Sequence, residues 1–407
     1  MILAVSTFAF LQVHIHRVAF APLIPTFIAD LGLTYAAAGA IMTAYFWTYA
    51  VAQIPIGVLT DRWGARRVMM VFVAVLALGV AVFPLSWSWG QSVLARALVG
   101  LGAAAVWVPS VRLISEWFPA RERGRAMGIV SAGGGLGGTL GLLMIPVLAD
   151  RLGWRLGYAT MLIPVLLSLT LIVLFIRAAR TEDIAGKEAV RITGDRPTGS
   201  ASFRGNLGAL RQVLATPELW PFNVAALLFY GAFFSLVTWV PTYLVKHGAS
   251  PSQAGLVTSL ISASTIVSWP LAGLLTDRLA RRKVVVLGSQ VLTCLFTLVF
   301  ALLVPGLPIW AAAAVALGTG IAVGGLIIPF VMVAELFPPE LAGTATGVLN
   351  TFFFIGALSI PVLLGRVVDL TGSFRWALVA AGCVQALATV AACFMRETGA
   401  GGRLLRP

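Results

Sequence analysis

The chain is divided into twelve long apolar stretches, each about as long as a bilayer's hydrocarbon core is thick. They lie near 2–28, 36–57, 68–88, 91–114, 125–148, 157–177, 219–244, 253–274, 284–304, 308–333, 343–366 and 375–395. A helix of about 20 apolar residues spans a bilayer, and a helix bonds all its backbone polar groups internally, as lipid requires. The sequence therefore predicts an all-α integral membrane protein with twelve transmembrane helices.

The amino-acid composition excludes soluble and nucleic-acid-binding proteins. The chain is 59% hydrophobic and 11% charged, with a mean hydropathy of +0.96, whereas soluble domains are about 25% charged. The net charge of +13 comes from basic residues in short groups between apolar stretches, so we expect no nucleic-acid partner. The residues form no nucleophile–base set or metal-type spacing, so we expect no catalytic site, metal or cofactor.

One polar stretch, from Arg177 to about Glu218, divides the apolar stretches into two sets of six. We predict a six-helix bundle at 1–177, a linker at 178–218, a second six-helix bundle at 219–396 and a tail at 397–407. Alternate connections, counted with the linker and tail, hold twenty Lys and Arg residues, and the remaining connections hold five. The positive-inside rule places the richer set in the cytoplasm. We therefore expect both termini in the cytoplasm of a bacterial cell and the helices in its inner membrane.

Two segments recur in the same order. Residues 57–67 read GVLTDRWGARR, and residues 273–283 read GLLTDRLARRK. The segment Glu116-Trp-Phe-Pro119 returns as Glu335-Leu-Phe-Pro338. Repeats at nearly one offset indicate a duplicated six-helix unit.

These motifs resemble those of the major facilitator superfamily. The G-x-L-x-D-R-x-G-x-R-R loop between the second and third helices is its most specific signature, and residues 96–104, RALVGLGAA, resemble its R-x-x-x-G-x-G-A-A pattern. The resemblance implies two pseudo-symmetric six-helix bundles around a central cavity, alternating access and no covalent chemistry, so we expect a transporter and not an enzyme.

The repeated loops are candidate gates. An Asp at one helix end can accept from free N–H groups at the start of another, and the arginines can pair with nearby glutamates in one packing of the bundles. The alternative is that the loops hold only orienting charge and a tight turn, and Ala280 in place of glycine weakens the second copy. The gating candidates are Gly57, Asp61, Arg62, Gly64, Arg66, Arg67, Arg96, Glu116, Asp277, Arg278 and Glu335.

Arg17 is the most informative charge. It lies within the first apolar stretch, where a charge costs at least about 2.5 kcal/mol, so we expect it to face a cavity and bind an anion. The alternatives are a structural Arg bonded to backbone carbonyls, or a shifted span from which the Arg17 side chain snorkels to the membrane surface. His14 lies one turn earlier on the same face, and His16 adjoins Arg17. Both histidines are candidates to carry a co-transported proton, or else they are packing residues.

Tyr45, Tyr49 and Gln53 share one face of the second helix. With Arg17 they resemble the anion:cation symporter branch of the superfamily, which moves organic anions such as sugar acids, often with protons. The branch often has acids where this chain has His16 and Ala103. A proton therefore has no carboxylate carrier, and either a histidine carries it or the protein exchanges anions.

The second half offers neutral candidates for the cavity: Asn223, Tyr230, Ser262, Thr265, Ser268 and Asn350. We therefore predict a monomeric secondary transporter for a small organic anion, a carboxylate or sugar acid, whose anionic end is held by the first half. Two alternatives remain. The glycine run at 133–138 faintly resembles nitrate transporters, which suggests nitrate or nitrite as the substrate, and the superfamily also includes drug and metabolite efflux pumps.

Overall fold

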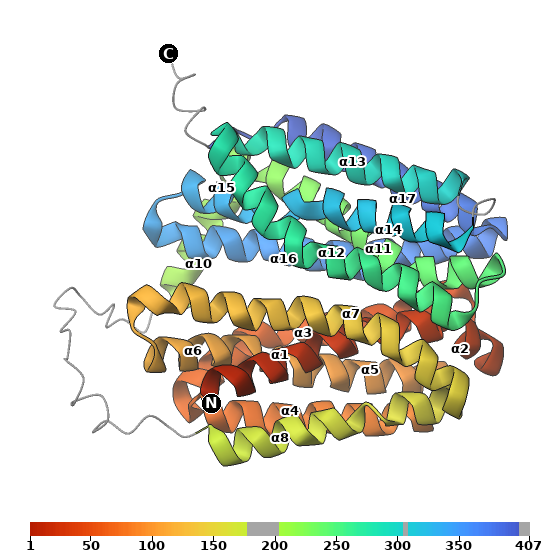
Figure 1. Ribbon diagram of the computed structural model, residues 1–407. Helices are drawn as coiled ribbons and strands as arrows, with labels where there is room; N and C mark the ends of the chain where they lie inside the picture. The colour runs from red at the N-terminus through yellow and green to blue at the C-terminus, as the bar shows by residue number, and fades with distance from the viewer. Residues whose placement is uncertain (177–202, 304–307, 399–407) are drawn as a thin grey trace.

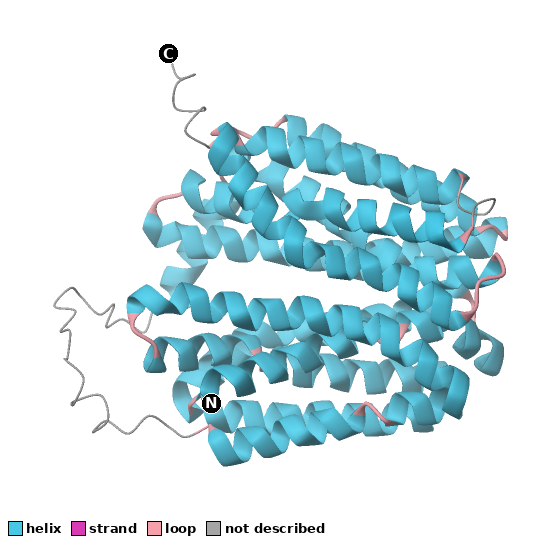
Figure 2. Cartoon of the chain, viewed as in Figure 1, coloured by secondary structure: helices cyan, strands magenta, loops and turns pink. Residues whose placement is uncertain are grey.

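The computed structural model describes residues 1–176, 203–303 and 308–398, which form helices joined by short loops and contain no strand (Figure 2). The first half comprises α1 (Ile2–Val18), η1 (Ala21–Leu23), α2 (Ile24–Leu31), α3 (Tyr35–Trp63), α4 (Ala65–Val82), η2 (Phe83–Leu85), α5 (Trp89–Ala104), α6 (Trp107–Trp117), α7 (Ala120–Ala159) and α8 (Leu162–Phe175). The second comprises α10 (Phe203–Leu214), η3 (Pro217–Leu219), α11 (Trp220–Lys246), α12 (Pro251–Leu279), α13 (Arg282–Leu302), α14 (Ile309–Ala322), η5 (Val323–Ile327), α15 (Ile328–Leu336), α16 (Pro339–Thr371) and α17 (Phe374–Cys393).

The predicted all-helical membrane fold is confirmed. In the described ranges, ten stretches are long and apolar enough to cross a membrane, by length and composition. One of them, Arg125–Phe175, covers most of α7 and all of α8, and α3 is a further long helix beside the ten stretches (Figure 1). These helices supply the twelve predicted crossings. Residue 177 of the predicted first bundle, residues 178–202 of the predicted linker and residues 399–407 of the predicted tail lie outside the described residues, and α10 lies within the predicted linker.

Three crossings that the sequence presents as continuous are each broken into two helices, α1 with α2, α5 with α6, and α14 with α15. In each case the second helix has a proline among its first three residues, namely Pro25, Pro109 and Pro329. Proline has no N–H with which to continue the preceding helix, but it fits a helix start. The break after α1 is important for the site because it leaves the carbonyl groups of the last turn of α1, which contains Arg17, without partners in that helix.

The two halves pack side by side, the first below and the second above in Figure 1, with α3 against α16 and α7 against α12. A glycine allows one of these approaches. A Cβ atom at Gly255 of α12 would lie 2.5 Å from the carbonyl oxygen of Leu142 of α7, so the helices could not pack this closely with a larger residue there.

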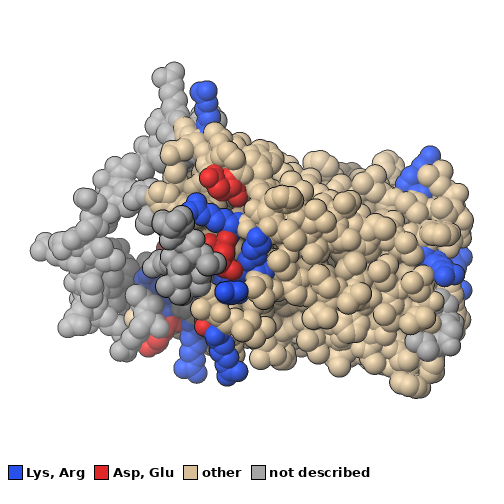
Figure 3. Space-filling view, turned by 90° about the horizontal axis from the view of Figure 1, so that it is seen from above, with Lys and Arg blue, Asp and Glu red and all other residues tan. Residues whose placement is uncertain are grey.

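Charged side chains gather at the two ends of the helices. On the face shown in Figure 3, Lys and Arg lie at both ends, Asp and Glu lie at one end, and a broad belt between the ends contains no charged side chain. The belt is what a protein surrounded by hydrocarbon needs, because charged side chains are expensive there.

The repeated loops end their helices similarly. Gly64 follows α3 with φ +80°, and Ala280 follows α12 with φ +52°. Positive φ is easy for glycine and costs about 1–2 kcal/mol for a residue with a Cβ atom. The second copy keeps the positive φ despite its alanine.

Candidate functional site

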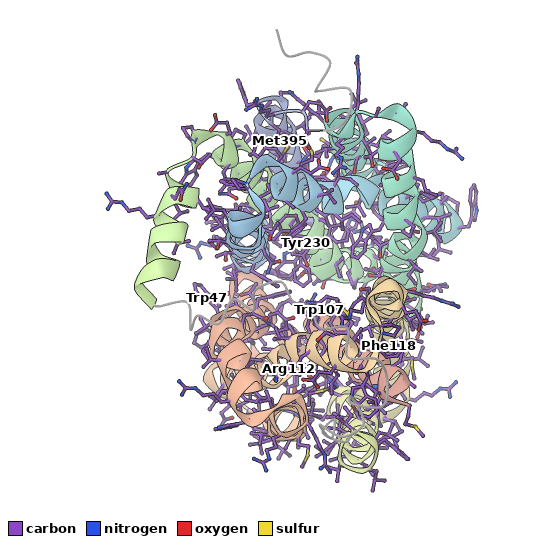
Figure 4. The ribbon with its side chains drawn as sticks, turned by 90° about the vertical axis from the view of Figure 1, so that its left-hand side faces the viewer. Trp47, Trp107, Arg112, Phe118, Tyr230 and Met395 are labelled. Carbon is purple, nitrogen blue, oxygen red and sulfur yellow. The ribbon has the colours of Figure 1, made fainter. Side chains whose placement is uncertain are left out.

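A cavity of about 270 Å³ lies between the two halves. The first half contributes Phe10, His14, Arg17, Val18, Trp107, Ser131, Gly134, Gly135 and Gly138, and the second half contributes Tyr230, Phe233, Phe234, Val237, Ser262, Thr265 and Trp269. In Figure 4, Trp107 and Tyr230 lie at the facing edges of the two bundles. Among these described lining residues, Arg17 is the sole Lys or Arg, and there is no Asp or Glu.

A larger groove of about 470 Å³ lies at the boundary between α3, α5 and α16. Exposed Trp47 and Trp89 line it, with mostly small or aliphatic residues and no charged side chain among them. The groove therefore offers no charged side chain to bind an ion, and the central cavity is the candidate site.

Arg17 is surrounded by rings. Its guanidinium carbon lies 5.3 Å from the ring centre of Tyr49, 5.9 Å from that of Tyr45 and 5.7 Å from that of Phe46. Tyr230 of α11 interacts with the same guanidinium from the other half. Aromatic faces attract a cation without neutralising it. Since no described ion pair involves Arg17, its charge remains available to an anion.

His14 accepts a hydrogen bond from Arg17. The His14 Nδ1 atom lies 3.2 Å from the carbonyl oxygen of Phe10, so Nδ1 carries the proton and donates it. Nε2 is then the acceptor for Nη1 of Arg17, 3.3 Å away. His14 packs against a glycine surface, because its ring lies within 3.0 Å of where a Cβ atom of Gly134 of α7 would be.

His16 differs from His14. It is buried outside the cavity lining, and its two ring nitrogens have no described partner. Its ring centre lies 6.3 Å from that of Tyr158. The structure thus brings only His14, of the two candidate histidines, to the described cavity wall.

Arg96 holds the end of α1. It is fully buried, and its Nη1 donates to the carbonyl oxygen of His16 at 2.7 Å and its Nη2 to that of Arg17 at 3.5 Å. The last carbonyls of a helix have no partner within it and favour a cation. Arg96 therefore supplies hydrogen bonds that the break after α1 removes, and it fixes the backbone that carries Arg17.

The tyrosines of α3 connect the halves beside Arg17. The rings of Tyr45 and Tyr49 are stacked with centres 5.8 Å apart, and the ring of Tyr49 lies 5.4 Å from that of Phe354 on α16. The Tyr45 hydroxyl donates to the carbonyl oxygen of Val13 at 3.3 Å. Helices α3 and α5 can pack this closely because Gly100 of α5 has no Cβ atom. A Cβ atom there would lie 2.0 Å from the Tyr45 carbonyl oxygen.

Tyr45 and Tyr49 contact Arg17 but are not among the residues that line the cavity, and the remaining substrate candidates also lie outside the lining. Gln53 is partly buried one turn beyond Tyr49, and exposed Asn350 lies one turn before Phe354 on the same face of α16. Asn223 is fully buried, with neither amide atom bonded to a described partner. Ser268 donates to the carbonyl oxygen of Gly320 and so braces α12 against α14.

The halves are joined at the ends of α3 and α16 that lie away from the repeated loops. The Asp369 carboxylate of α16 accepts from the backbone N–H groups of Tyr35 at 2.8 Å and Ala36 at 2.9 Å, which begin α3. On the other side of the boundary the hydroxyl of Ser252 of α12 donates to Asp150 of α7 at 2.7 Å. Both contacts cross between the halves.

Comparison with known proteins agrees with two similar halves around a cavity. The family model of the Major Facilitator Superfamily matches residues 6–250 and again residues 244–404. The chain belongs to the major facilitator superfamily. The first match runs through α11, and the second begins at residue 244, within the last residues of α11.

Several transporters of this superfamily are similar over most of the chain. A protein named probable galactarate/D-glucarate transporter GudP, of Escherichia coli, is 26% identical over 89% of this chain and 85% of its own. A protein named hexuronate transporter, of Bacillus subtilis, is also 26% identical, over 89% of this chain and 86% of its own. A solved structure of a bacterial homologue of the lysosomal transporter Spinster, described as inward-facing and unoccupied, has a TM-score of 0.81 at 17% identity, covering 97% of each chain.

The superfamily's repeated loops lie at the opposite end from Asp369. Arg66 donates to the carbonyl oxygen of Val173 of α8 at 2.7 Å. Glu116 pairs with Arg112 at 2.8 Å, and Glu335 pairs with Arg282 at 2.6 Å, each pair within one half. Arg62, Arg67, Asp277 and Arg278 are exposed, Gly57 is partly buried in α3, and the Asp61 side chain lies outside the described residues.

Sequence reasoning missed several residues of this site and its closure, among them two tryptophans and one aspartate. Trp107 and Trp269 line the cavity but lie in apolar stretches, where an indole looks like ordinary packing. Asp369 lies near Arg366 at the end of a predicted helix, where it looks like a loop charge. The available sequence signal was that Asp369 lies in a connection on the side of the membrane opposite the Lys- and Arg-rich loops.

Proposed function

We propose that this protein is a secondary transporter of a small organic anion of the sugar-acid or carboxylate type. The observation that carries the proposal is Arg17, a cation that lines the cavity between two six-helix halves without a described acidic partner. A buried cation normally has a counter-ion. An anionic substrate supplies that counter-ion, and the names of the similar sugar-acid transporters support this class.

The substrate's anionic end binds Arg17 between Tyr45, Tyr49 and Tyr230. The guanidinium presents several donors in a fork that fits a carboxylate. Tyr230 comes from the second half, so a bound anion contacts both halves. A ligand that touches both halves favours a packing in which the halves are close, and this couples binding to alternating access.

The gating residues act at the two opposite ends of the helix bundles. In the described conformation Asp369 ties the start of α3 to α16, while the repeated loops at the other end make bonds within their own halves. We infer that this conformation is closed at the Asp369 end. When the cavity opens there, the repeated loops exchange bonds within one half for bonds between the halves.

His14 couples a proton to the anion. A proton on Nε2 would place a second positive charge 3.3 Å from Arg17, which is unfavourable in an empty site. A bound anion stabilises both charges, so anion and proton bind together without a carboxylate carrier. The described charged group that contacts His14 is Arg17 on its own helix. Tyr230 of α11 interacts with Arg17, and α7 presents glycines to His14.

Orientation follows from charge. The ends of α3 and α12 carry the Arg-rich repeated loops, so we place them in the cytoplasm of a bacterial cell, with both termini on that side and the helices in the inner membrane. We propose that the transporter works as a monomer, because both halves of the cavity come from one chain.

Purified protein tests the proposal. In a thermal-shift screen of galactonate, galactarate, glucuronate, lactate, nitrate and nitrite, a specific ligand raises the unfolding temperature by mass action. Each anion that binds is then tested for counterflow in proteoliposomes. We expect organic anions to bind and to exchange. Binding of nitrate or nitrite alone, or no counterflow with any anion that binds, would contradict the proposal.

A further inference from the structure

The cavity wall is asymmetric in charge. Arg17 in the first half is its sole cation, and the polar side chains that the second half contributes are the neutral Tyr230, Ser262, Thr265 and Trp269. An anion with one carboxylate finds its counter-charge at Arg17. A second carboxylate at the far end would meet donors but no cation, and burying an unpaired carboxylate is expensive.

Trp269, which the second half contributes to the cavity wall, has an unused donor. Its Nε1–H group is inaccessible to solvent and has no described partner, although the ring lines the cavity. An indole N–H can only donate, and a buried donor without an acceptor costs about 1–3 kcal/mol. Ser262 and Thr265 lie on the same face of α12, but the Thr265 hydroxyl already donates to the carbonyl oxygen of Ser262 at 2.6 Å.

We propose that Trp269 is a specificity-determining residue and that the cavity selects monocarboxylates over dicarboxylates. The carboxylate binds Arg17, and a turn of the Trp269 ring toward the cavity lets its Nε1–H donate to a hydroxyl oxygen at the other end of the substrate. The aldonates, with one carboxylate and a terminal hydroxyl, fit this arrangement, whereas the aldarates have carboxylates at both ends. This inference rests on the proposed organic-anion function and narrows its substrate class.

The test compares galactonate with galactarate, which differ at one end alone. Calorimetric titration of the full-length protein in nanodiscs is expected to give at least tenfold tighter binding of galactonate. Trp269→Phe keeps the ring and removes the N–H, so we expect galactonate binding to weaken fivefold to twentyfold. Lactate reaches Arg17 but not Trp269, and its affinity should change less than twofold. Trp310→Phe, on the exposed surface of α14, is the control and should change neither affinity.

The outcomes separate the two proposals. If galactarate binds as tightly as galactonate, or if Trp269→Phe binds galactonate as the wild type does, the role of Trp269 is refuted and the organic-anion function stands. If folded wild-type protein binds none of the three anions, both proposals fail. Retained lactate binding by Trp269→Phe shows that this variant is folded. An equal loss of affinity for lactate and galactonate would indicate a structural role for Trp269 and refute the inference.

Discussion

The Nε2 atom of His14 lies 3.3 Å from Nη1 of Arg17, so the two candidate charges of the first helix are hydrogen-bonded to each other. His14 is consequently neutral in this arrangement and acts as the acceptor. In the proposed mechanism the pair holds one charge when the site is empty and two when an anion is bound. His16, two residues away, faces the buried interior of the first half.

This contact predicts different results for the two histidines. His14→Gln removes the proton carrier but keeps a polar side chain next to Arg17, so pH-driven accumulation of the anion in proteoliposomes should fall at least tenfold while anion exchange continues. His16→Gln should accumulate anion as the wild type does, since His16 lies outside the cavity lining. Equal accumulation by His14→Gln and the wild type would rule out His14 as the carrier.

Arg96 should matter for stability and for the position of Arg17. Arg96→Met removes the donors to the carbonyl oxygens of His16 and Arg17, and leaving a buried acceptor unpaired costs about 1–3 kcal/mol. We expect a lower unfolding temperature in detergent and weaker anion binding. Arg66→Met, which removes a single bond to Val173 at a helix end, should lower the unfolding temperature less. Equal unfolding temperatures for the wild type and Arg96→Met would contradict this role.

Asp369 should stabilise the described conformation. Its carboxylate meets the positive end of the α3 dipole, an interaction that contributes about 0.3–1 kcal/mol and up to about 2 kcal/mol when partly buried. Asp369→Asn should therefore shift the population threefold to tenfold toward the conformation open at this end. Spin labels at Leu156 and Leu370, with the three native cysteines replaced by serine, report the distance between the halves there.

The control for Asp369→Asn is Asp30→Asn. Asp30 pairs with Arg155 at 2.5 Å within the first half, so its loss should lower stability without lengthening the Leu156–Leu370 distance. The same distance distribution in Asp369→Asn and the wild type would show that Asp369 is not a latch between the halves.

The positive φ of Ala280 predicts a stabilising substitution. Ala280→Gly removes a steric cost of about 1–2 kcal/mol, although glycine also adds freedom to the unfolded chain. We expect a net gain of about 0.5–1 kcal/mol and a higher unfolding temperature. The matched control, Ala313→Gly inside α14, should lower that temperature because glycine weakens a helix interior. Destabilisation by both substitutions would contradict the strain at Ala280.

The sequence predicts the fold well because lipid leaves few options for apolar stretches of this length. It also points to Arg17, since a charge in such a stretch is rare, and to Tyr45 and Tyr49, since hydroxyls four residues apart share a face. The breaks in α1–α2, α5–α6 and α14–α15 were not predicted, because the apolar pattern continues through them.

The rest of the site depends on packing between distant segments. An indole such as that of Trp269 has the same sequence signature in a cavity wall as in a lipid-facing surface. Which helix start Asp369 contacts is decided by the arrangement of α3 against α16. Asn223 was a substrate candidate because of its amide, and the burial of its side chain depends on helices that its own sequence does not reveal.

The central claim is that Arg17 holds the anion, and binding to purified Arg17→Gln tests it most directly. Galactonate binding is measured by calorimetry for the wild type, for Arg17→Gln and for Arg211→Gln, an exposed arginine of α10 that serves as the control. A charge-assisted hydrogen bond contributes about 1.5–3 kcal/mol. We predict that folded Arg17→Gln binds galactonate at least tenfold more weakly, while Arg211→Gln binds it as the wild type does. Unchanged binding by folded Arg17→Gln would contradict the claim.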